Sequence, residues 1–171
     1  LFWFSFFLVV YIYLGYPLVI RILASNNKIK VFDESYLPSV SILIAAYNEE
    51  KEIKNTILNK LALDYPKNKL EIIVVSDESE DETDFIVEQV AKEADVSVKL
   101  IRQVPRKGKT SGLNLIAPEA TGDIILFSDA NSIYAPDALK KLVRNFADPK
   151  VGYVTGKMIY TNEDGSLVGD G

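Results

Sequence analysis

Hydrophobic and polar residues are unevenly distributed along the chain, and residues 1–20 carry no charge at all. Within this segment only Ser5, Gly15 and Pro17 are neither apolar nor aromatic. About 20 such residues, each rising roughly 1.5 Å along a helix, cross a bilayer core about 30 Å thick. The pattern therefore predicts a transmembrane helix over residues 1–24, which Pro17 would kink or stop near its end.

The flanks of this segment indicate its orientation. Positive charge follows at Arg21, Lys28 and Lys30. Because cytoplasmic flanks carry an excess of Lys and Arg, the downstream part is expected in the cytoplasm. A cleaved signal peptide and a buried helix of a soluble protein remain as alternatives. The signal peptide is disfavoured, since the apolar run exceeds a usual h-region of about 7–15 residues and no basic n-region precedes it.

A polar linker at residues 25–37 separates this segment from residues 38–171, where strand and helix patterns alternate. Short, nearly continuous apolar runs predict buried strands at residues 40–45, 71–76, 97–104, 123–127 and 151–160. Apolar positions at helical spacing predict helices at residues 49–63, 81–94, 110–117 and 135–146. Such alternation implies an α/β domain with an open, mostly parallel, doubly wound sheet. In these folds ligands bind beyond the carboxyl ends of the strands.

Composition narrows the chemistry that the chain can perform. The 171 residues include no His and no Cys, which excludes disulfides, thiolate metal sites and a Ser-His-Asp triad. Any metal must then be a hard cation held by oxygen, and any general base must be a carboxylate, Lys, Tyr or the substrate itself. With 24 acidic and 19 basic residues the net charge is −5, which disfavours nucleic acid as a partner.

Candidate ligand-binding residues follow the first two predicted strands. The segment Ala46–Glu49 (AYNE) contains Asn48, which suits a helix N-cap, and Tyr47, whose ring could face a nucleobase. Asp77 comes directly after the second strand, where it could accept hydrogen bonds from a base or a ribose. Capping of the following helix is the simpler alternative for both segments. A calcium loop beginning at Asp77 is rejected, because its sixth position holds Glu82 where Gly is needed.

The next two segments carry a basic loop and a pair of oxygen ligands. Residues 106–109 (RKGK) open a helix and could hold phosphate through their charge and free N–H groups. A P-loop is rejected, because Gln103 stands where that motif needs its first Gly. Asp129 and Asn131 follow the fourth strand, and their side-chain oxygens suit a divalent cation. A solvated basic turn and a turn stabilised by local hydrogen bonds remain as alternatives.

Three of these residues, Asp77, Lys109 and Asp129, follow three different strands. The carboxyl ends of parallel strands meet at one edge of a sheet, so these side chains should lie close together. Two carboxylates and a lysine beside an oxygen-rich cation site predict binding of a nucleotide diphosphate with Mg²⁺ or Mn²⁺.

The same segments resemble the family 2 glycosyltransferases, which have the GT-A fold and use nucleotide-diphospho-sugars. Four segments carry the resemblance, in order: residues 39–50 (SVSILIAAYNEE), 72–84 (IIVVSDESEDETD), 107–114 (KGKTSGLN) and 121–131 (TGDIILFSDAN). With the N-terminal span, the chain is similar to the processive membrane synthases of cellulose, hyaluronan and poly-N-acetylglucosamine.

The resemblance implies roles for particular residues. It places a set of residues around the nucleotide-sugar: Ala46, Tyr47, Asn48, Glu49, Asp77, Lys107, Lys109, Asn114 and Asp129. Asp129 would hold the first position of the family's Asp-x-Asp metal motif. Asn131 replaces the second Asp, so this position keeps an oxygen ligand and loses one charge.

The activity implied is transfer of a sugar, by metal-assisted inverting displacement, from a nucleotide-diphospho-sugar, with a UDP-sugar favoured, to a saccharide or lipid-linked acceptor. The enzyme would sit in the plasma or inner membrane with its catalytic domain in the cytoplasm. The family's acidic base and its Gln-x-x-Arg-Trp motif would follow Gly171, so residues 38–171 are expected to be an incomplete donor-binding domain. A non-catalytic nucleotide-sugar-binding or scaffold module at the membrane is the alternative.

Overall fold

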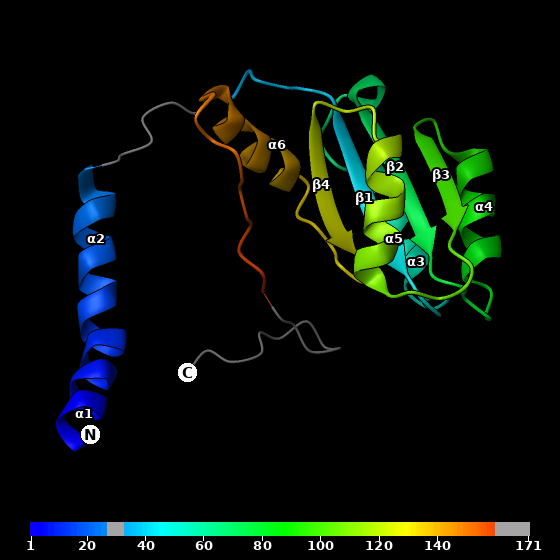
Figure 1. Cartoon of the computed structure of the whole chain (residues 1–171). Helices are drawn as coiled ribbons and strands as arrows, with labels where there is room; N and C mark the ends of the chain where they lie inside the picture. Colours follow the sequence, from blue (N-terminus) through cyan, green and yellow to red (C-terminus); the bar gives the residue numbers. More distant parts are fainter. Residues whose placement is uncertain (27–32, 160–171) are drawn as a thin grey trace. The chain divides into compact units, whose positions relative to one another are not determined.

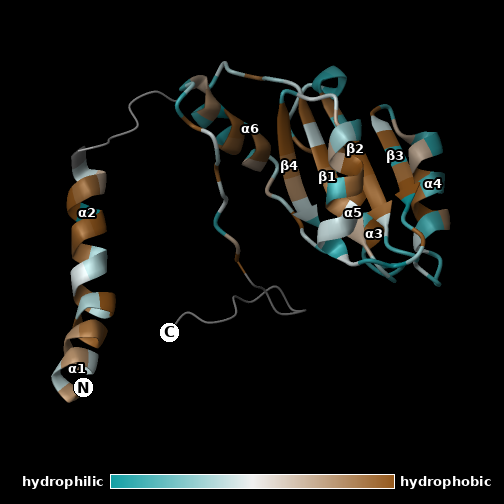
Figure 2. Cartoon of the chain, in the orientation of Figure 1, coloured by the Kyte–Doolittle hydropathy of each residue, from teal (hydrophilic) through white to brown (hydrophobic). Residues whose placement is uncertain are grey.

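The computed structural model describes residues 1–26 and 33–159, and it divides into two compact units between Phe32 and Asp33. The first unit is a helix built from α1 (Phe2–Val10), the π-helical turn η1 (Tyr11–Gly15) and α2 (Tyr16–Asn26) (Figure 1). Its residues Phe2–Ser25 are mostly apolar and are not buried, and this 24-residue stretch is long enough to cross a membrane by length and composition (Figure 2).

Pro17 does not stop this helix. A proline inside a helix lacks an N–H and crowds the carbonyl four residues earlier. Just before Pro17 the backbone widens into η1, and the N–H of Tyr16 bonds the carbonyl of Tyr11, five residues back. The helix then continues to Asn26, so the backbone widens locally before Pro17 and the helix does not end there.

The second unit contains a sheet of parallel strands. These strands are β1 (Val40–Ala46), β2 (Leu70–Ser76), β3 (Ser97–Arg102) and β4 (Ile124–Asp129), in the order β3-β2-β1-β4. All of the pairings are parallel, as predicted from the apolar runs. The most buried strands are the central pair, since every residue of β2 and nearly every residue of β1 is buried.

Helices cover both faces of this sheet, so the fold is doubly wound (Figure 1). One face, which includes Val40, Ile42 and Ile44 of β1, packs against α3 (Ile53–Leu61), α4 (Thr83–Glu93) and α6 (Ala138–Val143). The other face, which includes Leu43, packs against α5 (Lys109–Ile116). Short 3₁₀ turns complete the unit: η2 (Lys67–Lys69), η3 (Ala117–Glu119) and η4 (Arg144–Ala147).

The strand predicted at residues 151–160 is wrong over its described part. Residues 151–159 have no regular secondary structure, and Tyr160 lies outside the described residues. Within the described chain β4 pairs only with β1, so its outer edge carries no further strand. Ile125 and Phe127 on β4 are accordingly 40% and 55% exposed. A strand needs hydrogen bonds from a neighbour, and an apolar pattern alone does not supply them.

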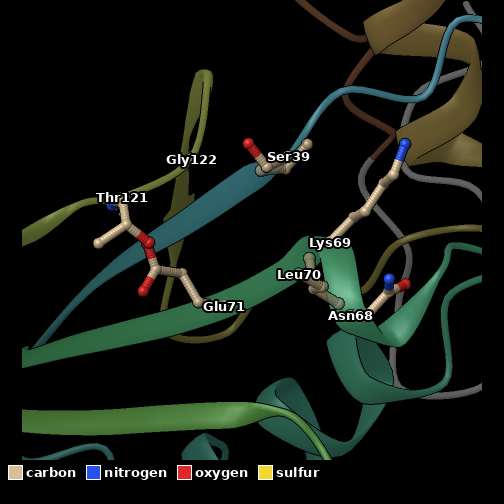
Figure 3. A pocket seen from close by; sticks show the side chains of 8 residues that line it. Ser39, Asn68, Lys69, Leu70, Glu71, Thr121 and Gly122 are labelled. Carbon is tan, nitrogen blue, oxygen red and sulfur yellow. Dashed lines mark hydrogen bonds between the residues drawn. The ribbon is translucent and has the colours of Figure 1, made fainter.

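The amino ends of β1, β2 and β4 are joined by the buried carboxylate of Glu71, which is 8% exposed. It accepts hydrogen bonds from the Ser41 hydroxyl (2.5 Å), the Thr121 N–H (2.6 Å) and the Thr121 hydroxyl (2.8 Å). Gly122 donates its N–H to the Ser41 oxygen at 2.8 Å, and a Cβ there would lie 2.6 Å from the Ser41 nitrogen. Figure 3 shows Glu71 facing Thr121. Both residues line a cavity of about 90 Å³. These contacts seat the start of β4 against β1.

Replacing Glu71 by Gln should destabilise the fold at neutral pH. Burial raises the pKa of Glu71, but hydrogen bonds from Ser41 and Thr121, together with Lys99, outweigh burial and leave this pKa below its ordinary value. The carboxylate therefore stabilises the fold above its unfolded pKa, and that contribution is lost as the pH falls through the folded pKa. We expect a loss of about 1–3 kcal/mol in the free energy of unfolding at pH 7.

Urea unfolding followed by circular dichroism measures this loss, and the difference from wild type should shrink as the pH is lowered. Glu119→Gln, the same change at an exposed position, is the matched control. An equal loss in both variants would contradict the role assigned to Glu71.

Candidate functional site

The candidate site lies where the strand order reverses. β2 and β3 follow on one side of β1, whereas β4 lies on the other side. The carboxyl ends of β1 and β4 therefore flank the switch point of the sheet, and the crevice at such a point is where doubly wound folds bind ligands. Tyr47 follows β1, Asp77 follows β2, Asp129 ends β4, and Lys109 begins α5. The structure therefore brings these predicted residues to one edge of the sheet.

The loops after β1 and β2 are joined by hydrogen bonds between side chains and backbone. The Asn48 N–H donates to the Ser79 hydroxyl at 3.2 Å, and the Glu49 N–H donates to the Thr83 hydroxyl at 2.8 Å. In return, the Glu80 N–H donates to the Asn48 side-chain oxygen at 2.9 Å. The polar residues after β2 thus accept N–H groups of the neighbouring loop, and Asp81 accepts the N–H of Thr83, the first residue of α4, at 3.0 Å.

The prediction that Asn48 caps the following helix is wrong. Helix α3 begins at Ile53, with Glu52 at its N-cap position. Asn48 adopts a left-handed backbone conformation with φ 53°, and its side-chain oxygen accepts a hydrogen bond from the Glu80 N–H instead. Asn tolerates this conformation better than most residues, which explains the residue type without a cap.

Asp77 is 4% exposed, and its carboxylate holds the loop before α5 in place. It accepts hydrogen bonds from the Lys107 N–H (2.9 Å), the Gly108 N–H (2.8 Å) and the Gln103 side-chain amide. Arg106 lies 3.7 Å from the same carboxylate. Burial raises the pKa of Asp77, but these donors and the guanidinium outweigh it, so the pKa lies below its ordinary value. Asp77 is therefore an ordered anion at neutral pH.

Tyr47 is already covered by a planar group. The guanidinium carbon of Arg106 lies 3.6 Å from the centroid of the Tyr47 ring. Guanidinium groups stack on aromatic faces because they are flat and weakly hydrated. The ring therefore presents one face to a planar ligand, and Arg106 occupies that face in this structure. Sequence reasoning noted Arg106 only as part of a basic loop and missed this contact.

Gln103 is the second residue that sequence reasoning missed. It was considered only as the position where a P-loop would need Gly, yet its buried side chain binds both Asp77 and the Ser111 hydroxyl (2.8 Å). A polar residue at the end of an apolar strand was the available signal, but its partners are distant in sequence.

Asp129 and Lys109 form an ion pair at the carboxyl end of β4, and the Asp129 side chain is 45% exposed. Burial raises the pKa of Glu49 above its ordinary value, and the carboxylates of Glu52, Asp81 and Asp129 raise it further. Glu49 therefore lies among carboxylates that include Asp129.

The residues fit a divalent cation shared with a ligand. The described residues contain no group of three or more acidic, His or Cys side chains that could enclose a metal. Mg²⁺ is commonly held by one or two carboxylates together with substrate phosphates, so a full cage is not needed. Asp129 offers a carboxylate and Asn131 an amide oxygen, and the Lys109 ammonium shows that Asp129 is accessible to a cation.

Comparison with known proteins identifies the family. Residues 41–169 match the family model described as Glycosyl transferase family 2. The chain belongs to glycosyltransferase family 2. A poly-beta-1,6-N-acetyl-D-glucosamine synthase from Staphylococcus aureus is 33% identical over 84% of this chain and 34% of its own length. The chain spans 27–34% of the length of the curated relatives that it matches.

Solved glycosyltransferases share the fold. A mannosyltransferase from Pyrobaculum calidifontis, solved with GDP-Man and Mn²⁺, matches with a TM-score of 0.72 and 32% identity, over 85% of this chain and 44% of that protein. TarS residues 1–349 from S. aureus, solved with UDP-GlcNAc, match with a TM-score of 0.56 and 28% identity, over 60% of this chain and 29% of that protein. The expected GT-A-like architecture is thus confirmed.

The remaining predicted residues of this family 2 domain differ in their contacts. Ala46 ends β1, and its carbonyl accepts the Asp77 N–H at 2.9 Å. Lys107 gives its N–H to Asp77, while the residue itself is exposed. Asn114 is exposed further along α5, and in the described chain its side chain forms no hydrogen bond with the other predicted site residues. Its role stays a prediction.

Replacing Asp77 by Asn should loosen the loop before α5. The neutral Asn side chain lacks the charge that strengthens the hydrogen bonds from the Lys107 and Gly108 N–H groups. Hydrogen bonds to a charged group are each worth about 1.5–3 kcal/mol. We expect hydrogen exchange of these two amides to rise about tenfold. Exchange measured by mass spectrometry tests this expectation, with Glu80→Gln as an exposed control in the adjoining loop. Unchanged exchange at residues 107–108 would contradict it.

Proposed function

We propose that this chain is the nucleotide-sugar-binding part of a membrane-anchored glycosyltransferase. The enzyme transfers a sugar from a UDP-sugar to a saccharide or lipid-linked acceptor on the cytoplasmic side of the membrane. The observation that carries the proposal is the convergence of Tyr47, Asp77, Lys109 and Asp129 at the crevice between β1 and β4. The apolar helix Phe2–Ser25 supports the anchoring. Arg21 near its end, together with Lys28 and Lys30 later in the sequence, supports the orientation.

The nucleoside would bind between the loops after β1 and β2. Arg106 moves aside and the base takes its place on the Tyr47 ring, which already accepts a planar group at 3.6 Å. Asp77 accepts a hydrogen bond from the base or the ribose through Oδ2. Within the described chain this oxygen accepts only the Gly108 N–H once Arg106 has moved, so it keeps a second lone pair. The solved neighbour that holds UDP-GlcNAc supports uracil as the base.

The diphosphate would lie between Lys109 and Asp129. Asp129 and Asn131 would hold Mg²⁺ or Mn²⁺, and the neighbour solved with GDP-Man and Mn²⁺ supports such an ion. Lys109 then leaves Asp129 and binds the phosphate oxygens. When bound, the metal neutralises charge on the departing diphosphate.

The reaction in this proposal is an inverting displacement. The acceptor hydroxyl attacks the anomeric carbon from the face opposite the diphosphate, and a carboxylate base takes the hydroxyl proton. Lys109 stabilises the charge that develops on the leaving group. We place the base and the acceptor site outside these 171 residues, so the chain alone should bind the nucleotide-sugar and turn over poorly.

Replacing Asp129 by Ala should abolish the metal dependence of UDP binding. Titration calorimetry of the full chain with UDP, with and without Mn²⁺, measures it. In the wild type we expect the metal to tighten binding at least about tenfold, and in Asp129→Ala to change it little. Glu119→Ala, at an exposed acidic position, should behave as wild type. A variant that keeps the full gain would refute the metal assignment, and stronger binding of GDP than UDP would refute the choice of base.

Replacing Lys109 by Met should separate phosphate binding from nucleoside binding. Loss of one charged hydrogen-bond partner should weaken UDP binding about tenfold without metal, while uridine, which has no phosphate, should bind unchanged. The matched control is Lys92→Met, at an exposed position of α4. Equal weakening of uridine and UDP would show that Lys109 does not lie at the diphosphate.

A further inference from the structure

The segment that carries the predicted metal ligands needs support from outside the sheet. Residues 129–134 leave the end of β4, which pairs with only one neighbour in the described chain, and turn without entering a helix. Helix α3 lies against this loop and presents Thr56, Asn59 and Lys60 to it. These residues are spaced i, i+3 and i+4, so they share one face of the helix.

Two of these side chains bind the two ends of the loop. The Thr56 hydroxyl donates to the Ala130 carbonyl at 2.6 Å, and Thr56 is fully buried. The Asn59 side-chain amide donates to the Tyr134 carbonyl at 3.0 Å, and its oxygen accepts the Tyr134 N–H at 2.8 Å. Asn59 therefore binds Tyr134 at two points, as a neighbouring strand would.

Lys60 binds the middle of the loop and is 0% exposed. Its ammonium donates to the Ser132 carbonyl, lies 3.4 Å from the Asn59 side-chain oxygen and stands 3.8 Å from the centroid of the Tyr134 ring. Among the described residues no carboxylate forms an ion pair with it. Burial lowers the pKa of Lys60 to about 8, so it keeps its charge at neutral pH.

A buried lysine without a carboxylate is costly, and an apolar side chain would fill the same space at less cost. The acceptors of this ammonium are the loop and Asn59, which itself binds the loop. The carbonyls of residues 130, 132 and 134 are all taken by α3, so every second peptide of the loop is held from the same side.

We propose that Thr56, Asn59 and Lys60 form a cradle, the α3 cradle, that positions the 129–134 loop so that Asp129 can bind the metal–diphosphate. Its members are positioning residues, since they hold the loop through its backbone. The identity of the ligand, a metal–diphosphate, rests on the proposed function. The binding of the 129–134 loop by α3 does not.

Hydrogen exchange of the full chain without any ligand tests whether the α3 cradle holds the 129–134 loop. In Lys60→Met we expect exchange of residues 130–134 to rise about tenfold while β1 and β2 exchange as in wild type. Lys54→Met, an exposed position on the same helix, is the matched control. Unchanged exchange in the loop, or an equal rise in β1 and β2, would overturn the cradle. If Lys60→Met does not fold, Asn59→Ala at a half-buried position should show the same local rise and decides the question.

Measurements of UDP and uridine binding, each with and without Mn²⁺, test whether the α3 cradle positions Asp129 for the metal–diphosphate. In Lys60→Met the gain in UDP affinity from Mn²⁺ should fall about tenfold, while uridine binding stays at the wild-type value. Wild-type metal dependence in this variant, or parallel loss of uridine binding, would overturn the positioning role. A wild-type chain that shows no metal-dependent UDP binding would overturn the proposed function. The exchange result would still decide whether the α3 cradle holds the 129–134 loop.

Discussion

The position of β4 beside β1 is the constraint on which the crevice depends. It reverses the strand order and so opens a site between the loops of two neighbouring strands. At the amino end, the Glu71 carboxylate bridges Ser41 and Thr121 and seats the strand. At the carboxyl end, Asp129 comes into register with Ala45, opposite the start of α5. An arrangement with β4 beside β3 would leave Asp129 far from the loop after β1.

Two buried charges hold the loops on either side of this crevice. Asp77 accepts backbone N–H groups of the loop before α5, and Lys60 donates to a backbone carbonyl of the loop after β4. Backbone groups have fixed positions once the strands are formed, so a single buried charge can set the course of a whole loop. The low polarizability around each charge strengthens these hydrogen bonds and makes loss of the partner costly.

Most of the sheet was predictable because its strands are short apolar runs, and the central strands β1 and β2 are buried on both faces. The apolar runs placed all four observed strands near their observed bounds, and the carboxyl-end rule anticipated that Asp77, Lys109 and Asp129 would lie at one edge. The helical positions were less accurate at their ends, since Asn48 binds a neighbouring loop instead of capping α3. The predicted strand at 151–160 failed because an apolar pattern says nothing about whether an edge is available to pair with.

By itself the sequence determined the apolar N-terminal helix, the alternation of strands and helices, and the four segments that mark family 2, because these follow from local periodicity and from neighbouring residues. Only the tertiary structure decided which strands pair, that Arg106 covers Tyr47, and that Lys60 lies buried beneath the loop of Asp129. Each of these contacts joins residues far apart along the chain. Their partners are chosen by packing and by the need to satisfy buried polar groups, and neither is encoded in the local pattern.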